Sequence, residues 1–158
     1  SPEKKFHLRE ISRLTDLSPP GVVKIVARLK KEGLLSSEST GVVENVFADK
    51  GGRFLRLKAC YNILAVHESG LVEFLRNEYE EPEAIVLFGS FARGEDTSKS
   101  DVDVAVVTNK SKKADLKKFE ARLAKKVNLY EIKVKECSKA FLNNLANGVV
   151  LYGYLKLM

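Results

Sequence analysis

The amino-acid sequence predicts an α+β protein with two parts: a helical N-terminal part that ends in a β-hairpin, and a C-terminal mixed β-sheet with flanking helices. The first observation is a helical spacing of apolar residues over the first thirty positions. The second is a pair of short apolar runs, at residues 84–88 and 102–107, which are typical of buried strands. We therefore predict an N-terminal domain over residues 1–58, a connecting helix over residues 59–81 and a C-terminal domain over residues 82–158.

The chain has 158 residues, of which 44% are hydrophobic and 30% are charged, as in soluble globular proteins. No apolar run approaches the roughly 18–20 residues of a membrane span, and no charged-then-apolar stretch suggests secretion. Cys60 and Cys137 match neither a disulfide framework nor a metal-binding spacing. We expect a cytoplasmic protein without a membrane partner, in which both cysteines stay thiols.

The formal net charge of +6 is concentrated in the N-terminal part. Residues 1–60 contain twelve Lys and Arg against seven Asp and Glu, whereas residues 61–158 contain fifteen against fourteen. A basic surface attracts polyanions such as nucleic acid. Charge alone still favours an ordinary solvated surface.

Two helices are predicted at the start of the chain. The first covers residues 6–14 and is followed by a polar break. Ser18 is a good N-cap for the second helix, and Pro19 suits its first turn. This helix runs to about Lys31 and ends at Gly33. The apolar face that we expect to be buried consists of Val22, Ile25, Val26 and Leu29.

A β-hairpin is predicted after the second helix. Its first arm contains Val42, Val43, Val46 and Phe47. Residues 49–52, Asp-Lys-Gly-Gly, have the composition of a tight turn. The second arm is predicted over residues 53–57, where successive side chains would point to opposite faces.

Two helices joined by a short turn and followed by a basic hairpin resemble the winged helix-turn-helix DNA-binding domain of archaeal and bacterial transcription regulators. The resemblance covers roughly residues 5–58 and implies that residues 19–31 form the recognition helix in the major groove. It implies DNA contacts by Pro20, Lys24 and Arg28 on that helix, and by Lys50 and Arg53 on the wing. Such domains usually begin with a further helix, so we expect that the N-terminus is truncated and the first helix is missing. The alternative is a packing or dimerisation module that does not bind DNA, as in a homodimer.

The segment 59–80 is predicted to be one long helix. The apolar run 84–88 then leads into Gly89 and Ser90. Glycine lets the backbone approach a bulky group, and a helix that begins there presents free N–H groups to an anion. Arg93, one turn further, could reach a phosphate, although a surface role fits it equally well.

Asp101 and Asp103 are two residues apart on the next predicted strand, so both point to one face of the sheet. Two adjacent carboxylates repel each other unless a cation lies between them, and their oxygens suit Mg²⁺. A phosphate-binding turn that faces a carboxylate pair is a site for a metal-bound nucleoside triphosphate. The alternative is that both are solvated carboxylates at a strand end and that Gly89 is only a turn.

Four further elements complete the C-terminal part. The pattern predicts an amphipathic helix over residues 111–126 and a strand over residues 127–135. Ser138 could cap a last helix through residue 146, and a strand or short apolar segment over residues 148–154 closes the chain.

Gly89-Ser90, ten intervening residues and then Asp101-Val102-Asp103 resemble the signature of the DNA polymerase beta nucleotidyltransferase superfamily. The segment Gly-Ser-Phe-Ala-Arg-Gly, together with Ser-Asp-Val-Asp, is most similar to the minimal nucleotidyltransferases of this superfamily. The resemblance covers about residues 82–155. It implies an enzyme that moves a nucleoside monophosphate, above all AMP, from Mg²⁺-bound ATP or another NTP to a hydroxyl. The implied acceptor is a protein, such as a HEPN-type toxin partner, or a small molecule.

Members of this superfamily usually supply a third carboxylate from the following strand. In the matching stretch, residues 127–131, Asn128 takes the place of that acid. Asn128 cannot act as a base and is a weaker Mg²⁺ ligand. Glu131 is the other candidate for this catalytic carboxylate, but its odd spacing puts it on the opposite face of a regular strand unless a bulge redirects it. The residues therefore also allow a DNA-binding regulator whose nucleotidyltransferase domain only senses nucleotide or dimerises.

Overall fold

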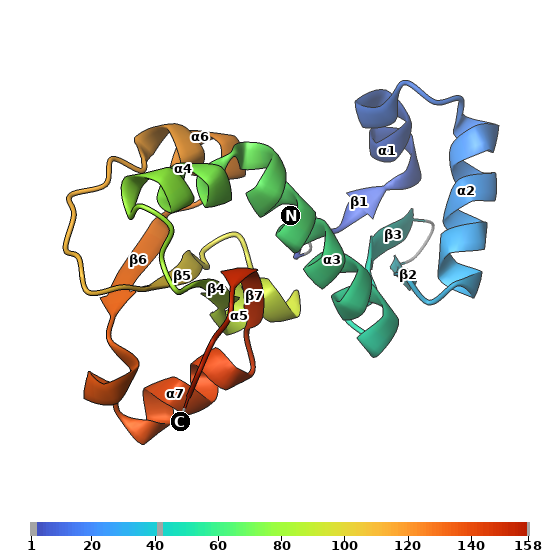
Figure 1. Cartoon of the computed structure of the whole chain (residues 1–158). Helices are drawn as coiled ribbons and strands as arrows, with labels where there is room; N and C mark the ends of the chain where they lie inside the picture. The colour runs from blue at the N-terminus through green and yellow to red at the C-terminus, as the bar shows by residue number, and fades with distance from the viewer. Residues whose placement is uncertain (1–2, 41–42, 158) are drawn as a thin grey trace. The chain divides into compact units, whose positions relative to one another are not determined.

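The computed structural model of the chain describes residues 3–40 and 43–157 (Figure 1). The chain forms two compact units, one up to Leu57 and one from Lys58 onward. Helix α3 (Gly52–Ser69) begins in the first unit and continues into the second. In the described part of the chain, no helix combines the length and the apolar character that a membrane crossing needs.

The N-terminal unit combines two helices with a three-stranded antiparallel sheet. Its elements are β1 (Phe6–His7), α1 (Leu8–Thr15), α2 (Pro19–Lys31), β2 (Leu35–Thr40) and β3 (Val43–Ala48), and the strand order is β1-β3-β2. Ser18 caps α2 because its Oγ accepts a hydrogen bond from the Gly21 N–H at 3.4 Å. Gly33, at φ +68°, lets the chain leave that helix and enter the sheet.

A small core holds this unit together. Val22 and Val26 of α2 are buried with Val46 of β3. Ile25, which the helical pattern assigned to the buried face, is 44% exposed. The buried stripe of α2 is narrower than predicted because the helix has only a small sheet to cover.

The hairpin lies earlier in the chain than the sequence predicts. Strands β2 and β3 pair antiparallel from Leu35 opposite Ala48 to Thr40 opposite Val43. Val42, assigned to the first arm, lies outside the described residues. Residues 53–57, predicted as the second arm, are helical in α3. A five-residue alternation does not separate strand from helix, and the Asp49 carboxylate accepts the Gly51 N–H at 2.9 Å beside the start of α3 instead of forming a hairpin tip.

The C-terminal unit contains a four-stranded sheet in the order β6-β5-β4-β7. Strands β5 and β6 are parallel, whereas β4 pairs antiparallel with both β5 and β7, which confirms the predicted mixed sheet with flanking helices. Its elements after α3 are α4 (Leu71–Glu78), β4 (Ala84–Phe88), α5 (Gly89–Arg93), β5 (Val102–Val107), α6 (Lys117–Leu123), β6 (Val127–Ile132), the 3₁₀ turn η1 (Val134–Glu136), α7 (Lys139–Ala146) and β7 (Val149–Gly153).

Two predicted boundaries change in this unit. The helix predicted over residues 59–80 breaks at Gly70, whose φ of +80° ends α3 and starts α4. The helix predicted from residue 111 begins only at Lys117, and Lys112 lies in the irregular segment that precedes it. The Lys112 N–H donates to Glu131 of β6 at 2.6 Å, a tertiary contact that helical spacing does not report.

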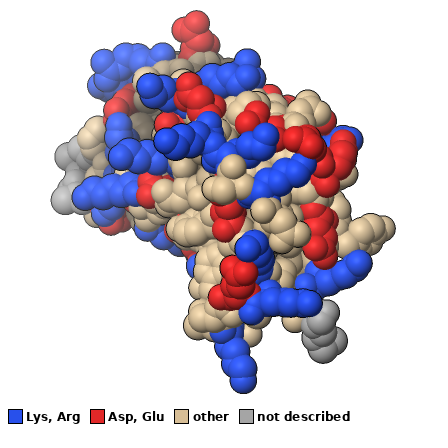
Figure 2. Space-filling model, turned by 60° about the vertical axis from the view of Figure 1, so that its left-hand side comes forward, with Lys and Arg blue, Asp and Glu red and all other residues tan. Residues whose placement is uncertain are grey.

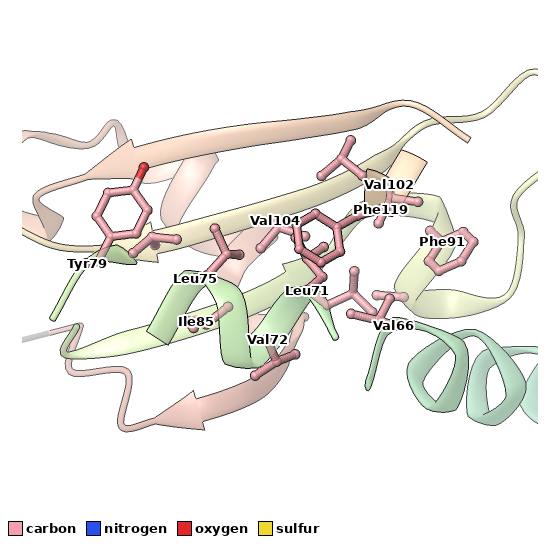
Figure 3. Close-up of a cluster of buried hydrophobic side chains, with 14 residues drawn as sticks. Val66, Leu71, Val72, Leu75, Tyr79, Ile85, Phe91, Val102, Val104 and Phe119 are labelled. Carbon is pink, nitrogen blue, oxygen red and sulfur yellow. The ribbon is translucent and has the colours of Figure 1, made fainter. Parts of the chain in front are cut away.

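Each face of the sheet carries its own apolar cluster. On one face, Val102 and Val104 of β5 pack with α4 and α6 (Figure 3). On the other face, Ala105 of β5 packs with α7 through Leu145. Since neighbouring residues of a strand point to opposite faces, Asp103 lies on the same face as Ala105 and α7.

Candidate active site

Three polar side chains meet across two strands on the α7 face of the sheet. The parallel pairing of β5 and β6 places Asp103 opposite Asn128. The Asn128 Nδ2 donates to Oδ1 of Asp103 at 3.0 Å and to Oδ2 of Asp101, just before β5, at 3.3 Å. All three residues are partly buried. The structure thus brings together Asp101, Asp103 and Asn128, as the sequence motif requires.

Gly89 lies directly against this group. Its φ is +75°, a conformation that glycine adopts at little cost. A Cβ at this position would lie 2.5 Å from Oδ2 of Asp103. The contact exists because β4 pairs with β5 so that Phe88 stands opposite Asp103. A larger residue would fit here only if the Asp103 carboxylate moved, so glycine keeps the backbone beside the carboxylates.

Ser90 and Arg93 lie on the short helix α5 that follows. Ser90 is partly exposed next to Gly89, where the sequence places a phosphate contact. Arg93 is exposed and its Nε donates to Glu95 at 2.7 Å. The structure therefore gives Arg93 a surface partner, and its role toward a phosphate stays a prediction.

The oxygen atoms of this site fit a Mg²⁺ ion with one neutral ligand. Hard divalent cations bind carboxylate and amide oxygens, and Asp101 and Asp103 supply two adjacent carboxylates. The Asn128 carboxamide can turn its Oδ1 toward the same point, because an asparagine has one accepting and one donating end. In the described part of the chain, no group of three or more His, Cys, Asp and Glu side chains forms a metal site. The third charge of a three-carboxylate site is missing here.

Glu131, predicted as a catalytic residue, does not join this group. The β5–β6 register runs without a break from Val102 and Val127 to Val107 and Ile132, so no bulge turns Glu131 toward the carboxylates. Its carboxylate accepts hydrogen bonds from the Tyr79 hydroxyl at 2.6 Å, the Ser111 hydroxyl at 2.7 Å and the Lys112 N–H. Burial raises the pKa of the Glu131 carboxyl, but these hydrogen bonds outweigh it and lower the pKa below its ordinary value. On the opposite face of the sheet, Glu131 therefore links β6 to Tyr79 and to the segment that contains Ser111 and Lys112.

Tyr130 is a neighbour of the carboxylates that the motif did not indicate. It follows Asn128 by two residues on β6 and so shares its face. Its ring centroid lies 5.4 Å from that of Phe88 and 5.8 Å from that of Phe141 on α7. Burial, together with the charge and hydrogen bonding of Asp103, raises the pKa of the Tyr130 hydroxyl. Strand alternation from Asn128 was the sequence signal that could have identified it.

A cavity of about 780 Å³ lies at the other end of the same sheet. It is lined by residues at the carboxyl ends of β5 and β6, such as Val107 and Ile132, and by the segment before β4. The carboxylates lie toward the beginning of β5. None of Asp101, Asp103 and Asn128 lines this cavity.

The residues predicted to contact DNA fall into two groups. Pro20, Lys24 and Arg28 are all exposed on α2, at the i, i+4, i+8 spacing of one helix face. Lys50 lies after β3 and Arg53 lies in the first turn of α3. The prediction that both belong to the hairpin is therefore wrong, because neither is part of β2 or β3. The Arg53 Nη2 donates to Glu32 at 3.3 Å. On the face shown in Figure 2, Lys and Arg side chains lie among Asp and Glu side chains, so charge alone marks no nucleic-acid surface there.

Comparison with known proteins gives distant structural neighbours. A solved toxin-antitoxin structure with AMP-PNP is 24% identical, with a TM-score of 0.44, and the match covers 55% of this chain and 73% of that chain. A mutant of the toxin-antitoxin MntA-HpeT is 22% identical, with a TM-score of 0.45 and the same coverage. No curated protein matches the sequence.

The family assignment comes from the sequence itself. The model of the family described as "Polymerase beta, Nucleotidyltransferase" matches residues 70–155, which is more than half of the chain. This range holds the sheet, the Gly89 turn and both carboxylates of the β5 motif. The chain belongs to the polymerase beta nucleotidyltransferase family.

Proposed function

We propose that the C-terminal unit transfers a nucleoside monophosphate, AMP above all, from an NTP to a hydroxyl and releases pyrophosphate. The observation that carries this proposal is the meeting of three segments at one point: the Gly89 turn, the Asp101–Asp103 pair and Asn128. Because Gly89 has no side chain, an anion-binding turn can lie directly beside a carboxylate pair that suits a cation, and this is the arrangement that a metal-bound triphosphate needs. The family assignment supports the same class of reaction.

Each residue has a proposed role in that reaction. Asp101 and Asp103, with Oδ1 of Asn128, would hold Mg²⁺, which supplies charge neutralisation for the triphosphate. Gly89 and Ser90 bind the β- and γ-phosphates through backbone and hydroxyl donors. The chain thereby orients the α-phosphate for in-line attack, so that catalysis depends mainly on positioning.

Removal of the acceptor proton is the weak point of this site. Asn128 cannot take a proton, and Glu131 is held on the other face of the sheet. General-base catalysis typically contributes 10²–10⁴-fold, so we expect transfer to be slower by about that factor than in a site with a third carboxylate. Nucleotide binding is expected to survive.

We propose that the acceptor is a hydroxyl of a protein partner, a HEPN-type toxin as the minimal nucleotidyltransferases imply, and that the N-terminal unit binds DNA as a winged helix-turn-helix. The exposed face of α2 with Pro20, Lys24 and Arg28 supports DNA binding, since one helix face with two cations suits a major groove. The β2–β3 hairpin takes the place of the wing. The protein would then combine promoter binding with modification of its partner.

The decisive experiment is transfer of label from α-³²P-ATP with Mg²⁺ to the protein and to a lysate of its source. A labelled band that disappears in the Asp101→Asn/Asp103→Asn variant establishes the enzyme and isolates the acceptor. A band of equal intensity with that variant refutes the assignment of the site. The matched control is Lys110→Ala, which breaks an exposed ion pair with Glu80 and should leave the band unchanged.

The second candidate is a DNA-binding regulator whose C-terminal unit only binds nucleotide. The observation that favours it is Asn128, whose amide N–H groups satisfy both carboxylates without a cation. Removing Lys24 and Arg28 together should lower DNA affinity and reduce the slope of log K against log salt by about two, since each phosphate contact contributes about 0.9. An unchanged affinity and slope would remove α2 as the recognition helix. Lys133→Ala, in the C-terminal unit, serves as the control.

A further inference from the structure

A buried carboxylate lies in the loop that joins the phosphate turn to the metal carboxylates. Asp96 belongs to the segment between α5 and β5, and its side chain is 5% exposed. Two ammonium groups face it, those of Lys58 and Lys125, whose side chains are each 13% exposed. A buried charge costs free energy unless it is paired, so removing the charge of any one of these three side chains should destabilise the position of the other two.

Helix α3 contributes one side of this cluster. The Lys58 Nζ donates to the Asp96 carboxylate, to the Asp96 carbonyl at 2.7 Å and to the Gly94 carbonyl at 3.3 Å. One turn later, the buried Asn62 donates to the Asp96 carboxylate at 2.7 Å and to the Phe91 carbonyl of α5 at 2.8 Å. The end of α5 and the first half of the loop are therefore fixed to α3.

The segment between α6 and β6 contributes the other side. The Lys125 Nζ lies 3.4 Å from the Asp96 carboxylate and donates to the carbonyls of Thr97 at 2.5 Å and Ser100 at 3.1 Å. The following residue, Lys126, accepts the N–H of Val102 at 2.8 Å. The second half of the loop is thus fixed up to the residue that separates Asp101 from Asp103.

We propose that Asp96 is a positioning residue: together with Lys58, Asn62 and Lys125 it fixes the end of α5 and Asp101, which lie outside the β4–β5 pairing, relative to the phosphate-binding turn. Gly89 and Asp101 lie at the two ends of the segment that this cluster holds. The proposal rests on the proposed function, because it assigns the cluster to the placement of the same two groups. A misplacement of about 1 Å costs on the order of 10²-fold in rate when catalysis depends on orientation.

The test is the Asp96→Asn variant, which keeps the shape of the side chain and removes its charge. We expect kcat for nucleotidyl transfer to fall about 10- to 100-fold while KM for the NTP stays within about threefold, because β4 and β5 keep their own pairing and only their connection loosens. Hydrogen exchange gives a second readout that needs no activity. The N–H groups of Glu95, Thr97 and Ser100, bonded within this segment, should exchange at least about tenfold faster.

The matched control is Tyr79→Phe, which removes a part-buried hydrogen bond to Glu131 on the opposite face of the sheet. It should leave kcat within about twofold and the exchange of the loop unchanged. Wild-type kcat and wild-type exchange in Asp96→Asn overturn the proposal, as does an equal loss of kcat in both variants. If Asp96→Asn does not fold, Lys125→Met, which leaves Asp96 paired with Lys58, must show the same effects at smaller size. If the wild-type protein transfers no label, the proposed function fails, and the exchange data alone decide whether Asp96 orders the loop.

Discussion

The Cβ that Gly89 lacks would lie 2.5 Å from Oδ2 of Asp103, closer than any side-chain carbon can approach. The two residues belong to neighbouring antiparallel strands, so the turn after β4 and the carboxylate of β5 are held in one place by strand pairing. The glycine of this motif is needed for two reasons at once, its positive φ and this contact. The first prediction separates the two.

Gly89→Ala should weaken Mg²⁺–nucleotide binding at least about tenfold, because the methyl group must displace the Asp103 carboxylate. The matched control is Gly70→Ala. Gly70 also has a positive φ, of +80°, but its Cβ would meet only the Arg122 guanidinium at 3.7 Å. Both variants carry the cost of about 1–2 kcal/mol for a left-handed alanine, and only Gly89→Ala carries about 1–3 kcal/mol more for the clash. Equal melting temperatures and equal nucleotide affinities for the two would contradict this account.

Asn128→Asp should create the missing third carboxylate. Without metal the variant is expected to melt at a lower temperature than the wild type, because it replaces two N–H···O contacts by repulsion among three carboxylates. With Mg²⁺ the order should reverse, and transfer should rise by about 10²-fold or more if a base limits it. Differential scanning calorimetry with and without Mg²⁺, followed by the label-transfer assay, checks both parts. Asn128→Ala, which adds no charge, should not gain activity.

Two variants of Tyr130 should distinguish its hydroxyl from its ring. Tyr130→Phe keeps the contacts with Phe88 and Phe141, so we expect the free energy of unfolding to change by less than about 1 kcal/mol. Tyr130→Ala loses both ring contacts and should cost about 1–3 kcal/mol, each aromatic pair contributing about 0.5–1.5 kcal/mol beyond the buried area. Urea unfolding measures both. A large effect of Tyr130→Phe on transfer, without one on stability, would mark the hydroxyl beside Asp103 as part of the site.

Glu131 should make the stability of the protein sensitive to acid. Its pKa is lower in the folded protein than in the unfolded chain, so its contribution is fully present above the unfolded pKa, near 4.3, and disappears as the pH falls through the folded value. Glu131→Gln should therefore reduce the slope of unfolding free energy against pH below about pH 4.5. Because glutamine has nearly the same shape as glutamate, the folded structure should be unchanged at pH 7. Denaturant titrations from pH 3 to pH 7 give that slope. An identical slope in the variant would show that the hydrogen bonds from Tyr79 and Ser111 do not favour the charged form.

Much of the candidate site could be predicted from short spacings. The β4 strand, the Gly89 turn and the alternation of Asp101 and Asp103 depend on residues that are close in sequence, and the structure has them as expected. Asn128 lies opposite Asp103, where the alternation of its strand predicts it, and its role toward a metal stays a prediction. The hairpin was misplaced because a five-residue alternation in residues 53–57 is also compatible with the helix that forms there. Lys50 and Arg53 were assigned to a wing as a consequence.

The sequence by itself determined the local chemistry: a glycine where the backbone must turn, two carboxylates on one strand face, and an asparagine where an acid is usual. Tertiary structure decided which groups meet. The face that Glu131 occupies depends on an unbroken register between β5 and β6. The pairing of Asp96 with Lys58 joins residues 38 positions apart, and no periodicity connects them. Hydrophobic periodicity reports on residues that are close in sequence. Strand order and side-chain burial bring together residues that are far apart in sequence, so these contacts are seen only in the folded chain.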